Sequence, residues 1–503
     1  MVAVGLSRTR PSYEGLEAPW SPGIAYPELE GLLGAGAVEG PPDNHVYAAV
    51  RASIRGLGLD VARFGTAGWN PLRELVAEGS TIVLKPNFIR HWNPSEGAGG
   101  TVQSVITHGA VLRAMADYAL LAAGPEGRVI VAEAPQMDCD FDRIREIVGL
   151  DQIVEYLERV AGRRLEVVDL RREAVRFEDG IITERKSLPG DPLGYRAVDL
   201  GTKSFFSGSG LDPNRFRGAD YDPGPTTEHH RGGRNAYLLS ETVLSADLVI
   251  NLPKLKTHKK TGVTLALKNL VGINGDKNWL PHHSVGATDQ GGDEFPENRL
   301  IDRLRSKATE IARPLLARGR GYRFFRAARK VEWATRGSSF IRAGNWYGNR
   351  TTWRMCCDLN RCLYYSDRDG LHLDSPEPVK QVLTVIDAVV GGEGEGPLAP
   401  VDVPLGVVIA GLDPIGVDVA AVRLMGFDEE KLEKLSAPMR DAGPRITKVR
   451  SAADVRIHEV GPDSFEMREY PVDEICCERV FEPHAGWVGH VERTRSLDEA
   501  VSS

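Results

Sequence analysis

The sequence predicts an α/β protein with mainly parallel sheets flanked by helices. Several short runs are rich in β-branched residues and apolar without alternation, which is typical of parallel strands covered on both faces. Segments with helical periodicity lie between them, and such alternation builds layered α/β folds. Two irregular blocks interrupt the pattern, so we also expect a long loop-rich excursion and a basic helical insertion.

Six strands and two helices carry this prediction. The helices are expected over 108–124, where the periodicity stops at a glycine, and over 416–427, after the last strand. The predicted strands are "TIVLKPN" (81–87), "RVIVAEA" (128–134), "LEVVDL" (165–170), "DLVINLP" (247–253), "LTVIDAVV" (383–390) and "PLGVVIAGLDP" (404–414).

Changes in pattern divide the chain into five parts. The excursion holds turn-forming stretches such as "YDPGPTTEHHRGGRN" with little periodicity, and loops of that length are more often functional than idle. The predicted parts are an N-terminal extension with lead-in helices (1–79), an α/β core (80–277) with the excursion at 171–240, a basic and largely helical insertion (278–375), a return to the core (376–435) and a C-terminal extension (436–503).

The composition is that of a globular protein without a disulfide framework. With 503 residues, 42% of them apolar, and a net charge of −8, the chain can form two or three compact units. No signal peptide and no transmembrane segment is recognisable, so a cytoplasmic location is expected. The six cysteines form no CxxC motif and are interpreted as reduced core thiols, or Cys356, Cys357 and Cys362 as sharing a cluster or a metal.

A strongly basic segment lies in the predicted insertion. Arg299 to Arg336 contains twelve Lys or Arg and three acids, a local net charge of +9, with Tyr322, Phe324, Phe325 and Trp333 among them. Apolar residues fall at helical spacing, as in a helix that binds a membrane surface or nucleic acid. A helical arm packed on an acidic partner, or on a second subunit in a homo-oligomer, has the same pattern.

The stretch "NLPKLKTHKKTGVTLALKNLVG" (251–272) is the main candidate site. We expect a lysine-rich loop between the strand at 247–253 and a helix from Thr261 to Leu270, at the strand edge where α/β sheets bind ligands. The helix start adds free N–H groups, and Thr261 can cap it. The residues expected to surround an anion there are Lys254, Lys256, His258, Lys259 and Lys260.

Lys268 is the unusual member of this stretch. It lies among leucines, so its side chain either faces the site or extends outward to solvent. Asn269 beside it and Gly272 just beyond favour the site, because a glycine lets the backbone approach a ligand. A desolvated lysine among cations has a lowered pKa and can act as base or nucleophile.

Further polar residues lie at other strand ends. Lys85 and Asn87 follow one strand, and Asn251 ends another, so their convergence on one crevice is a hypothesis. His258 together with His282 or His283 could bind a divalent transition metal, although surface histidines look the same in sequence. The carboxylates that could hold Mg²⁺ or pair with the lysines are Asp387, Glu393, Glu395, Asp413 and Asp418.

Four long motifs together resemble the domain-of-unknown-function 362 family. They are "VLKPN", "ADLVINLPKLKTHKKTGVTLALKNLVG", "GNWYGNRTTWRMCCDLNRCLYY" and "VIDAVVGGEGEGPLAP…IAGLDPIGVDVAAVRLMGF", and they span most of residues 80 to 430. The resemblance implies no particular reaction. Many relatives carry a ferredoxin-like module with four-cysteine iron–sulfur motifs, and this chain has no such motif.

The same stretch is distantly similar to nickel-pincer lactate racemases. In that family a lysine tethers the pincer nucleotide and a later histidine binds nickel. His258 and Lys268 stand ten residues apart as in those enzymes, and His282 and His283 fall near the place of the later histidine. "TLALKN" stands where those enzymes have a glycine-rich turn.

The sequence thus predicts an enzyme that binds an anionic small molecule or a nucleotide-like cofactor in a crevice lined by Lys, His and Asn. Metal-assisted isomerase or redox chemistry on an acid or hydroxy acid is the expected reaction, with His258 and Lys268 as catalytic residues. The alternatives are a non-catalytic protein that binds a phosphorylated ligand or nucleic acid, and a redox partner of iron–sulfur proteins.

Overall fold

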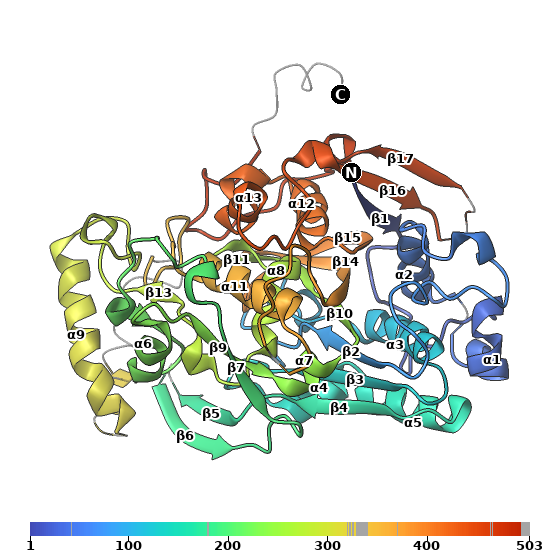
Figure 1. Ribbon diagram of the computed structural model, residues 1–503, viewed down its shortest axis with the longest axis horizontal. Coiled ribbons are helices and arrows are strands. Elements are labelled where there is room, and N and C mark those ends of the chain that lie inside the picture. Colours follow the sequence, from blue (N-terminus) through green and yellow to red (C-terminus); the bar gives the residue numbers. More distant parts are fainter. Residues whose placement is uncertain are drawn as a thin grey trace.

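The computed structural model is built around one large mixed sheet (Figure 1). It describes residues 1–493 except 42, 179–180, 319, 321–322, 324–325, 328–340, 370, 463 and 465, and the side chain of residue 35. Tyr322, Phe324, Phe325 and Trp333 of the basic segment therefore lie outside the described residues.

Eleven strands of the described chain form this sheet. Nine of them follow the order β17-β16-β1-β15-β14-β10-β2-β3-β4, while β11 pairs with β14 and β12 pairs with β11. The strands are β1 (Val2–Arg8), β2 (Thr81–Pro86), β3 (Arg128–Glu133), β4 (Leu165–Asp169), β10 (Leu248–Leu252), β11 (Lys254–His258), β12 (Gly262–Val263), β14 (Gln381–Glu395), β15 (Ala399–Gly411), β16 (Val455–Val460) and β17 (Met467–Pro471).

Most neighbouring strands in the central part of the sheet run parallel. The series β14-β10-β2-β3-β4 is parallel throughout, as is the pair β1 and β16. Antiparallel pairing joins β14 to β15, β15 to β1 and β16 to β17. The α/β class is confirmed, and all six predicted strands exist, while β1, β16 and β17 add terminal segments to the same sheet.

Helices cover both faces of the sheet. Alternate residues of one strand enter different cores: Ile82 and Leu84 of β2 belong to one cluster and Val83 to the other. This explains the unbroken apolarity of the strands. On one side lie α1 (Glu30–Leu33), α2 (His45–Arg55), α3 (Gly109–Ala123), α4 (Phe141–Ile147) and α5 (Leu150–Ala161). On the other lie α8 (Leu265–Asn269), α11 (Thr352–Tyr365), α12 (Pro414–Leu424) and α13 (Glu433–Arg440).

The excursion and the part of the insertion before α11 lie outside the main sheet. The excursion contains more regular structure than its turn-rich sequence indicated: its strands form three small two-stranded sheets, one of them with the insertion. Its elements are β5 (Glu173–Glu178), β6 (Ile181–Ser187), β7 (Tyr195–Asp199), β8 (Phe216–Arg217), α6 (Gly224–His230) and β9 (Ala236–Ser240), and α7 (Glu241–Ser245) follows it. The insertion supplies β13 (His283–Ser284), which pairs with β8, and α9 (Leu300–Ala317), at the left edge of Figure 1.

Cys356, Cys357 and Cys362 are free thiols buried within α11. None of the helices in the described part of the chain is long and apolar enough to cross a membrane.

Candidate functional site

The lysine-rich stretch is a strand, so the prediction of a loop there is wrong. Lys254 to His258 form β11, which continues beyond β10 and pairs with the far half of β14. The strand at 383–390 is longer than predicted: β14 reaches Glu395, so Glu393 and Glu395 lie in a strand and not in a glycine-rich loop. Alternate side chains of a strand face opposite sides, so Lys254 and Lys256 lie on one side of β11 and Leu255 and Thr257 on the other.

The predicted helix from Thr261 is also wrong, because α8 begins only at Leu265. Leu265 has a φ of 52°, a left-handed conformation that bulky residues rarely adopt. The backbone changes direction here, between β12 and the rest of α8. Asp418, in the interior of α12, accepts hydrogen bonds from the N–H groups of Ala266 and Leu267 at 2.7 and 3.3 Å. The helix start is therefore already capped, and Thr261 donates to the Val263 carbonyl instead of capping it.

A cavity of about 410 Å³ lies beside α8 and β11. Three groups of side chains line it: cations, histidines and apolar residues, with a few polar groups between them. The lining residues are Lys256, Lys259, Lys260, Lys268, Lys277, Arg313, His258, His282, His283, Asn87, Asn269, Gln136, Glu133, Thr264, Ile89, Ala134, Met137, Phe177, Gly218, Ala219, Val271, Gly272, Ala343, Pro397 and Leu398. The volume suits one small organic molecule.

Ten of the predicted site residues lie together in this lining. They come from the ends of β2 and β11, from α8 and the turn after it, and from the segment around β13, so distant parts of the sequence converge on one cavity. Both His282 and His283 line the cavity, although alternation along an extended chain led us to expect only one of them. The ten residues are Asn87, Lys256, His258, Lys259, Lys260, Lys268, Asn269, Gly272, His282 and His283.

Three further predicted residues lie directly behind the lining. Lys85 forms an ion pair with Glu133 at 2.6 Å. Lys254 is completely buried, 3.0 Å from Asp387, and donates to the Tyr13 hydroxyl. Asn251 accepts a hydrogen bond from the Asn269 side chain at 2.8 Å. These contacts hold the cavity wall in place.

The two predicted cofactor-binding acids lie elsewhere. Glu393 forms an ion pair with Arg479 at 2.5 Å and accepts from the Glu482 N–H. Asp413 caps α12 by accepting from the N–H groups of Ile415 and Gly416, and neither acid lines the cavity. Both carboxylates therefore stabilise local structure through contacts with the protein itself.

The cavity has an excess of positive charge. Glu133 is the one carboxylate among the described lining residues, and Lys85 already neutralises it. Burial lowers the pKa of Lys260 and Lys277 to about 7 and that of Lys259 to about 8, with like charges as a further cause for each. An electrostatically unsatisfied cluster of this kind favours an anionic ligand.

Lys268 lies at the electrostatic centre of this cluster. Its amine has no hydrogen-bond or ion-pair partner among the described residues, and burial lowers its pKa. After burial itself, the charge of Lys268 is among the causes that lower the pKa values of Lys256, His258 and His282. Lys268 therefore faces the cavity and does not extend to solvent.

The two histidines nearest this lysine have opposite hydrogen-bonding roles. The Lys260 N–H donates to Nδ1 of His258 at 3.0 Å, so Nδ1 has no proton and the neutral ring carries it on Nε2. His282 Nδ1 lies 2.9 Å from the Leu280 carbonyl oxygen, which can only accept, so this ring carries its proton on Nδ1. His258 is consequently a donor through Nε2, and His282 has a free lone pair on Nε2.

The metal hypothesis finds no support in these contacts. Within the described part of the chain, no group of three or more His, Cys, Asp or Glu side chains is placed to hold a metal ion. The protonated Nε2 of His258 also has no lone pair for a metal.

Two polar atoms of the wall have no partner. Gln136 Oε1 and Thr264 Oγ1 are buried and make no hydrogen bond with any described residue, yet both residues line the cavity. Buried polar atoms are costly to leave unsatisfied, and both atoms are enclosed by protein, so they destabilise the wall locally and are not contacts for a ligand.

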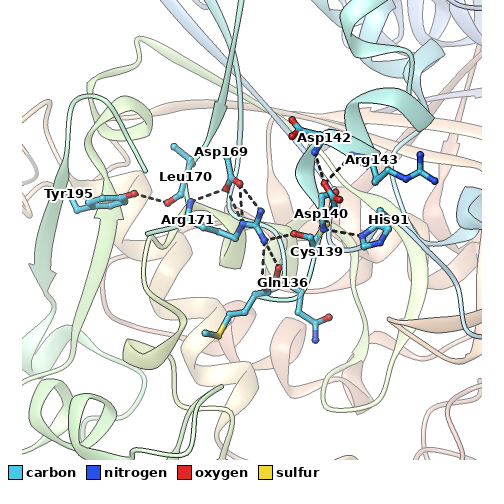
Figure 2. A network of polar contacts seen from close by, with 11 residues as sticks. His91, Gln136, Cys139, Asp140, Asp142, Arg143, Asp169, Leu170, Arg171 and Tyr195 are labelled. Atoms are coloured by element: carbon cyan, nitrogen blue, oxygen red, sulfur yellow. Dashed lines mark hydrogen bonds and ion pairs between the residues drawn. The ribbon is translucent and has the colours of Figure 1, made fainter. Parts of the chain in front are cut away.

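One arginine fixes the loop that forms the floor of the cavity. Arg171 pairs with Asp169 at 2.6 Å and donates to the carbonyl oxygens of Gln136, Met137 and Cys139, as Figure 2 shows for this network. The loop between β3 and α4 carries the lining residues Gln136 and Met137. Its conformation therefore depends on a charge-assisted network behind the cavity.

Several lining residues were missed by the sequence analysis. Glu133 lies at the end of a recognised strand and Gln136 just after it, so the strand-end argument applied to Lys85 could have found them. Lys277 lies five residues beyond the motif that ends at Gly272. Phe177 and Arg313 come from the excursion and α9, and no local pattern connects either residue with the cavity.

A family model described as a domain of unknown function, DUF362, matches residues 166–423, just over half of the chain. The chain belongs to the DUF362 family. The matched range includes β10, β11, α8 and α9, while the parts of the DUF362 cavity contributed by β2 and β3 precede it. A comparison with curated proteins finds no match, and the similarity to nickel-pincer lactate racemases is not shown.

Proposed function

We propose that this DUF362 protein is an enzyme that binds a small organic acid carrying a hydroxyl group and isomerises it by proton transfer. The observation that supports this most strongly is the joint presence, in one cavity, of uncompensated lysines and two histidines of opposite hydrogen-bonding role. Lysines alone would suit any anion, whereas a free imidazole lone pair beside them provides a base.

The lysines would bind the carboxylate. The positive charge comes from three lysines of the lining, Lys256, Lys260 and Lys268. The Nε2–H group of His258 adds a hydrogen-bond donor. The hydroxyl of the ligand would bond to the side-chain amides of Asn87 or Asn269, which line the cavity. The apolar residues Ile89 and Leu398 would contact the carbon part of the ligand.

His282 would act as the base. Its Nε2 takes the proton from the carbon between the hydroxyl and the carboxylate, and the electron pair of the C–H bond moves into the carboxylate. The resulting enediolate carries an additional negative charge, which the surrounding lysines stabilise. A second proton, from the ammonium group of Lys268, then reaches the opposite face of the same carbon and gives the mirror-image acid. His282 afterwards releases its proton to solvent and Lys268 takes one up, so the reaction needs no oxidant or reductant.

Isotope exchange tests the reaction directly. The purified chain is incubated in D₂O with a panel of short 2-hydroxy acids, and NMR follows deuterium incorporation at the carbon bearing the hydroxyl. We expect exchange for at least one acid, a loss of at least about a hundredfold in His282→Asn, and no loss in the surface control Lys186→Met. Asn cannot act as a base but retains a polar side chain of similar size.

Binding without exchange is the outcome that would reject the enzyme. Saturable binding of the acids, measured by calorimetry, with no deuterium incorporation by any of them favours the alternative of a non-catalytic anion-binding protein. The unprotonated Nε2 of His282 argues against that alternative. A hydrogen-bond acceptor does not help to bind an anion, so a site that only binds anions has no use for this nitrogen.

A further inference from the structure

Helix α9 has one face that packs against the cavity wall. Glu310 forms an ion pair with Arg217, Ser306 donates to Glu294 at 2.7 Å, and Arg313 donates to the Asp220 carbonyl at 3.1 Å. Ala312 is 4% exposed. These contacts fix the orientation of the helix, so its other face points away from the protein.

The outer face of α9 carries a stripe of exposed apolar side chains. Leu300, Leu304, Ile311 and Leu315 are 69%, 59%, 72% and 41% exposed, and their spacing places them along one side of the helix. Ile301 beside them is 49% exposed. Large exposed apolar side chains elsewhere in the described chain are more scattered, so this concentration in a single helix indicates a binding surface.

Basic residues border the stripe. Arg303, Lys307 and Arg318 are exposed, and each is without an ion-pair partner in the described part of the chain. The two acids of the helix face inward: Asp302 lies 3.7 Å from Arg305, and Glu310 pairs with Arg217. The outer face therefore combines apolar area with uncompensated positive charge.

We propose that the outer face of α9 docks the protein on an anionic lipid surface. A helix lying in the plane of a membrane needs an apolar stripe to enter the acyl boundary and basic residues to meet the headgroups, and α9 presents both on one side. Figure 1 shows the helix at the edge of the molecule, where a flat surface can reach it.

The same features disfavour two other partners. Nucleic acid is bound through charge and stacking, and exposed leucines and isoleucines contribute to neither. A second copy paired through α9 would bring Arg303, Lys307 and Arg318 close to their own counterparts, with no exposed acid of the helix to compensate. Anionic lipid complements both the charge and the apolar stripe.

Vesicle flotation with the full chain tests the proposal. The vesicles contain phosphatidylcholine alone or mixed with phosphatidylglycerol. We expect binding to the mixed vesicles, little binding to phosphatidylcholine alone, and weaker binding at high salt. The double variant L304E/I311E and the charge variant R303E/K307E should each reduce binding at least about tenfold. Leu193→Glu, which changes a 49% exposed leucine in the excursion, is the matched control and should bind normally.

Three results would overturn the proposal. They are an absence of binding to the mixed vesicles, equal binding by wild type and L304E/I311E, and a dimer in light scattering that L304E/I311E dissociates while vesicles remain unbound. Circular dichroism of each variant confirms that the fold is intact, which is expected because all substituted side chains are exposed.

Discussion

The backbone N–H of Lys260 donates to the ring of His258 at 3.0 Å, and this single contact determines the role of that ring. Burial, followed by the charges of Lys268 and Lys259, also lowers the pKa of His258 well below 6.5. We therefore expect His258 to be neutral at pH 7, with its proton on Nε2. Nitrogen NMR of the labelled protein can observe the tautomer directly.

Substitution of His258 tests its role as a donor. Gln places an amide N–H near the position of Nε2, so His258→Gln should retain affinity for inorganic phosphate within about threefold, whereas His258→Ala should lose about tenfold. Calorimetric titration with phosphate measures both values. Equal losses in the two variants would show that the ring contributes shape and not a hydrogen bond.

Removal of the charge of Lys268 should stabilise the protein while weakening anion binding. The amine has no partner among the described residues and lies among other cations, so Lys268→Met removes repulsion and keeps the volume. We expect the free energy of unfolding to rise by about 1 kcal/mol at neutral pH, measured by urea denaturation.

The matched control for this substitution is Lys186→Met in the exposed strand β6, which should change stability by less than about 0.5 kcal/mol. Phosphate affinity should fall in Lys268→Met and remain unchanged in the control. A destabilised Lys268→Met protein with normal phosphate binding would contradict the assignment of Lys268 to the site.

The pH dependence of stability follows from the depressed lysines. The folded-state pKa values of Lys260 and Lys277 are about 7, and that of Lys259 is about 8, against 10.5 for ordinary lysine. Between about pH 7 and 10.5 the unfolded chain binds more protons than the folded one, so these groups make stability rise with pH across that window. Denaturation curves at pH 7 and 9 should therefore show a more positive change in the free energy of unfolding for the wild type than for the triple substitution of these lysines by Met.

Anion affinity should change with pH in the opposite direction. Only protonated lysines attract an anion, so the affinity for sulfate, which stays a dianion throughout, should fall as pH rises through 7 to 8 while Lys260, Lys277 and then Lys259 lose their protons. A bound anion raises these pKa values, and binding at pH 7.5 should therefore take up protons. Calorimetry in two buffers of different ionisation enthalpy measures the uptake, and proton release on binding would contradict the model.

The sequence predicted the sheet well because its strands are apolar on both faces. It located most of the lysine and histidine lining because these residues lie in one motif, from Lys256 to Lys268. It failed on local structure there: the backbone between β10 and α8 pairs with the extended β14, a long-range contact that propensity cannot reveal. Glu393 and Asp413 were candidates by composition, but neighbours distant in sequence occupy their carboxylates.

Loss of Arg171 should loosen the cavity floor. The guanidinium bridges Asp169 and three carbonyl oxygens of the loop between β3 and α4, so Arg171→Ala removes the charged donor that these acceptors share (Figure 2). The carbonyls of Gln136 and Met137 keep only the N–H groups of Cys139 and Val175. We expect a cost of about 2 to 4 kcal/mol in the free energy of unfolding, together with weaker phosphate binding. The neighbouring Arg172→Ala is the control: its side chain is 55% exposed and lies 3.8 Å from Asp276, so it should cost less than about 1 kcal/mol. Similar costs for both variants would mean that the network does not fix the loop.

Gly272 is required by a close approach to the ion pair behind the site. A Cβ at this position would lie 1.8 Å from Glu133 Oε1 and 2.7 Å from Lys85 Nζ, and the other carboxylate oxygen of Glu133 forms the ion pair with this lysine. Gly272→Ala must therefore displace the pair or shift the turn after α8, and we expect a destabilisation of about 2 kcal/mol or more, with loss of phosphate binding. Gly31→Ala, in the exposed helix α1 where a Cβ meets nothing within 4 Å, should be neutral or stabilising. Normal stability of Gly272→Ala would contradict this prediction. If Lys85→Met unfolds the chain in that case, the ion pair stabilises the fold but does not require a glycine beside it.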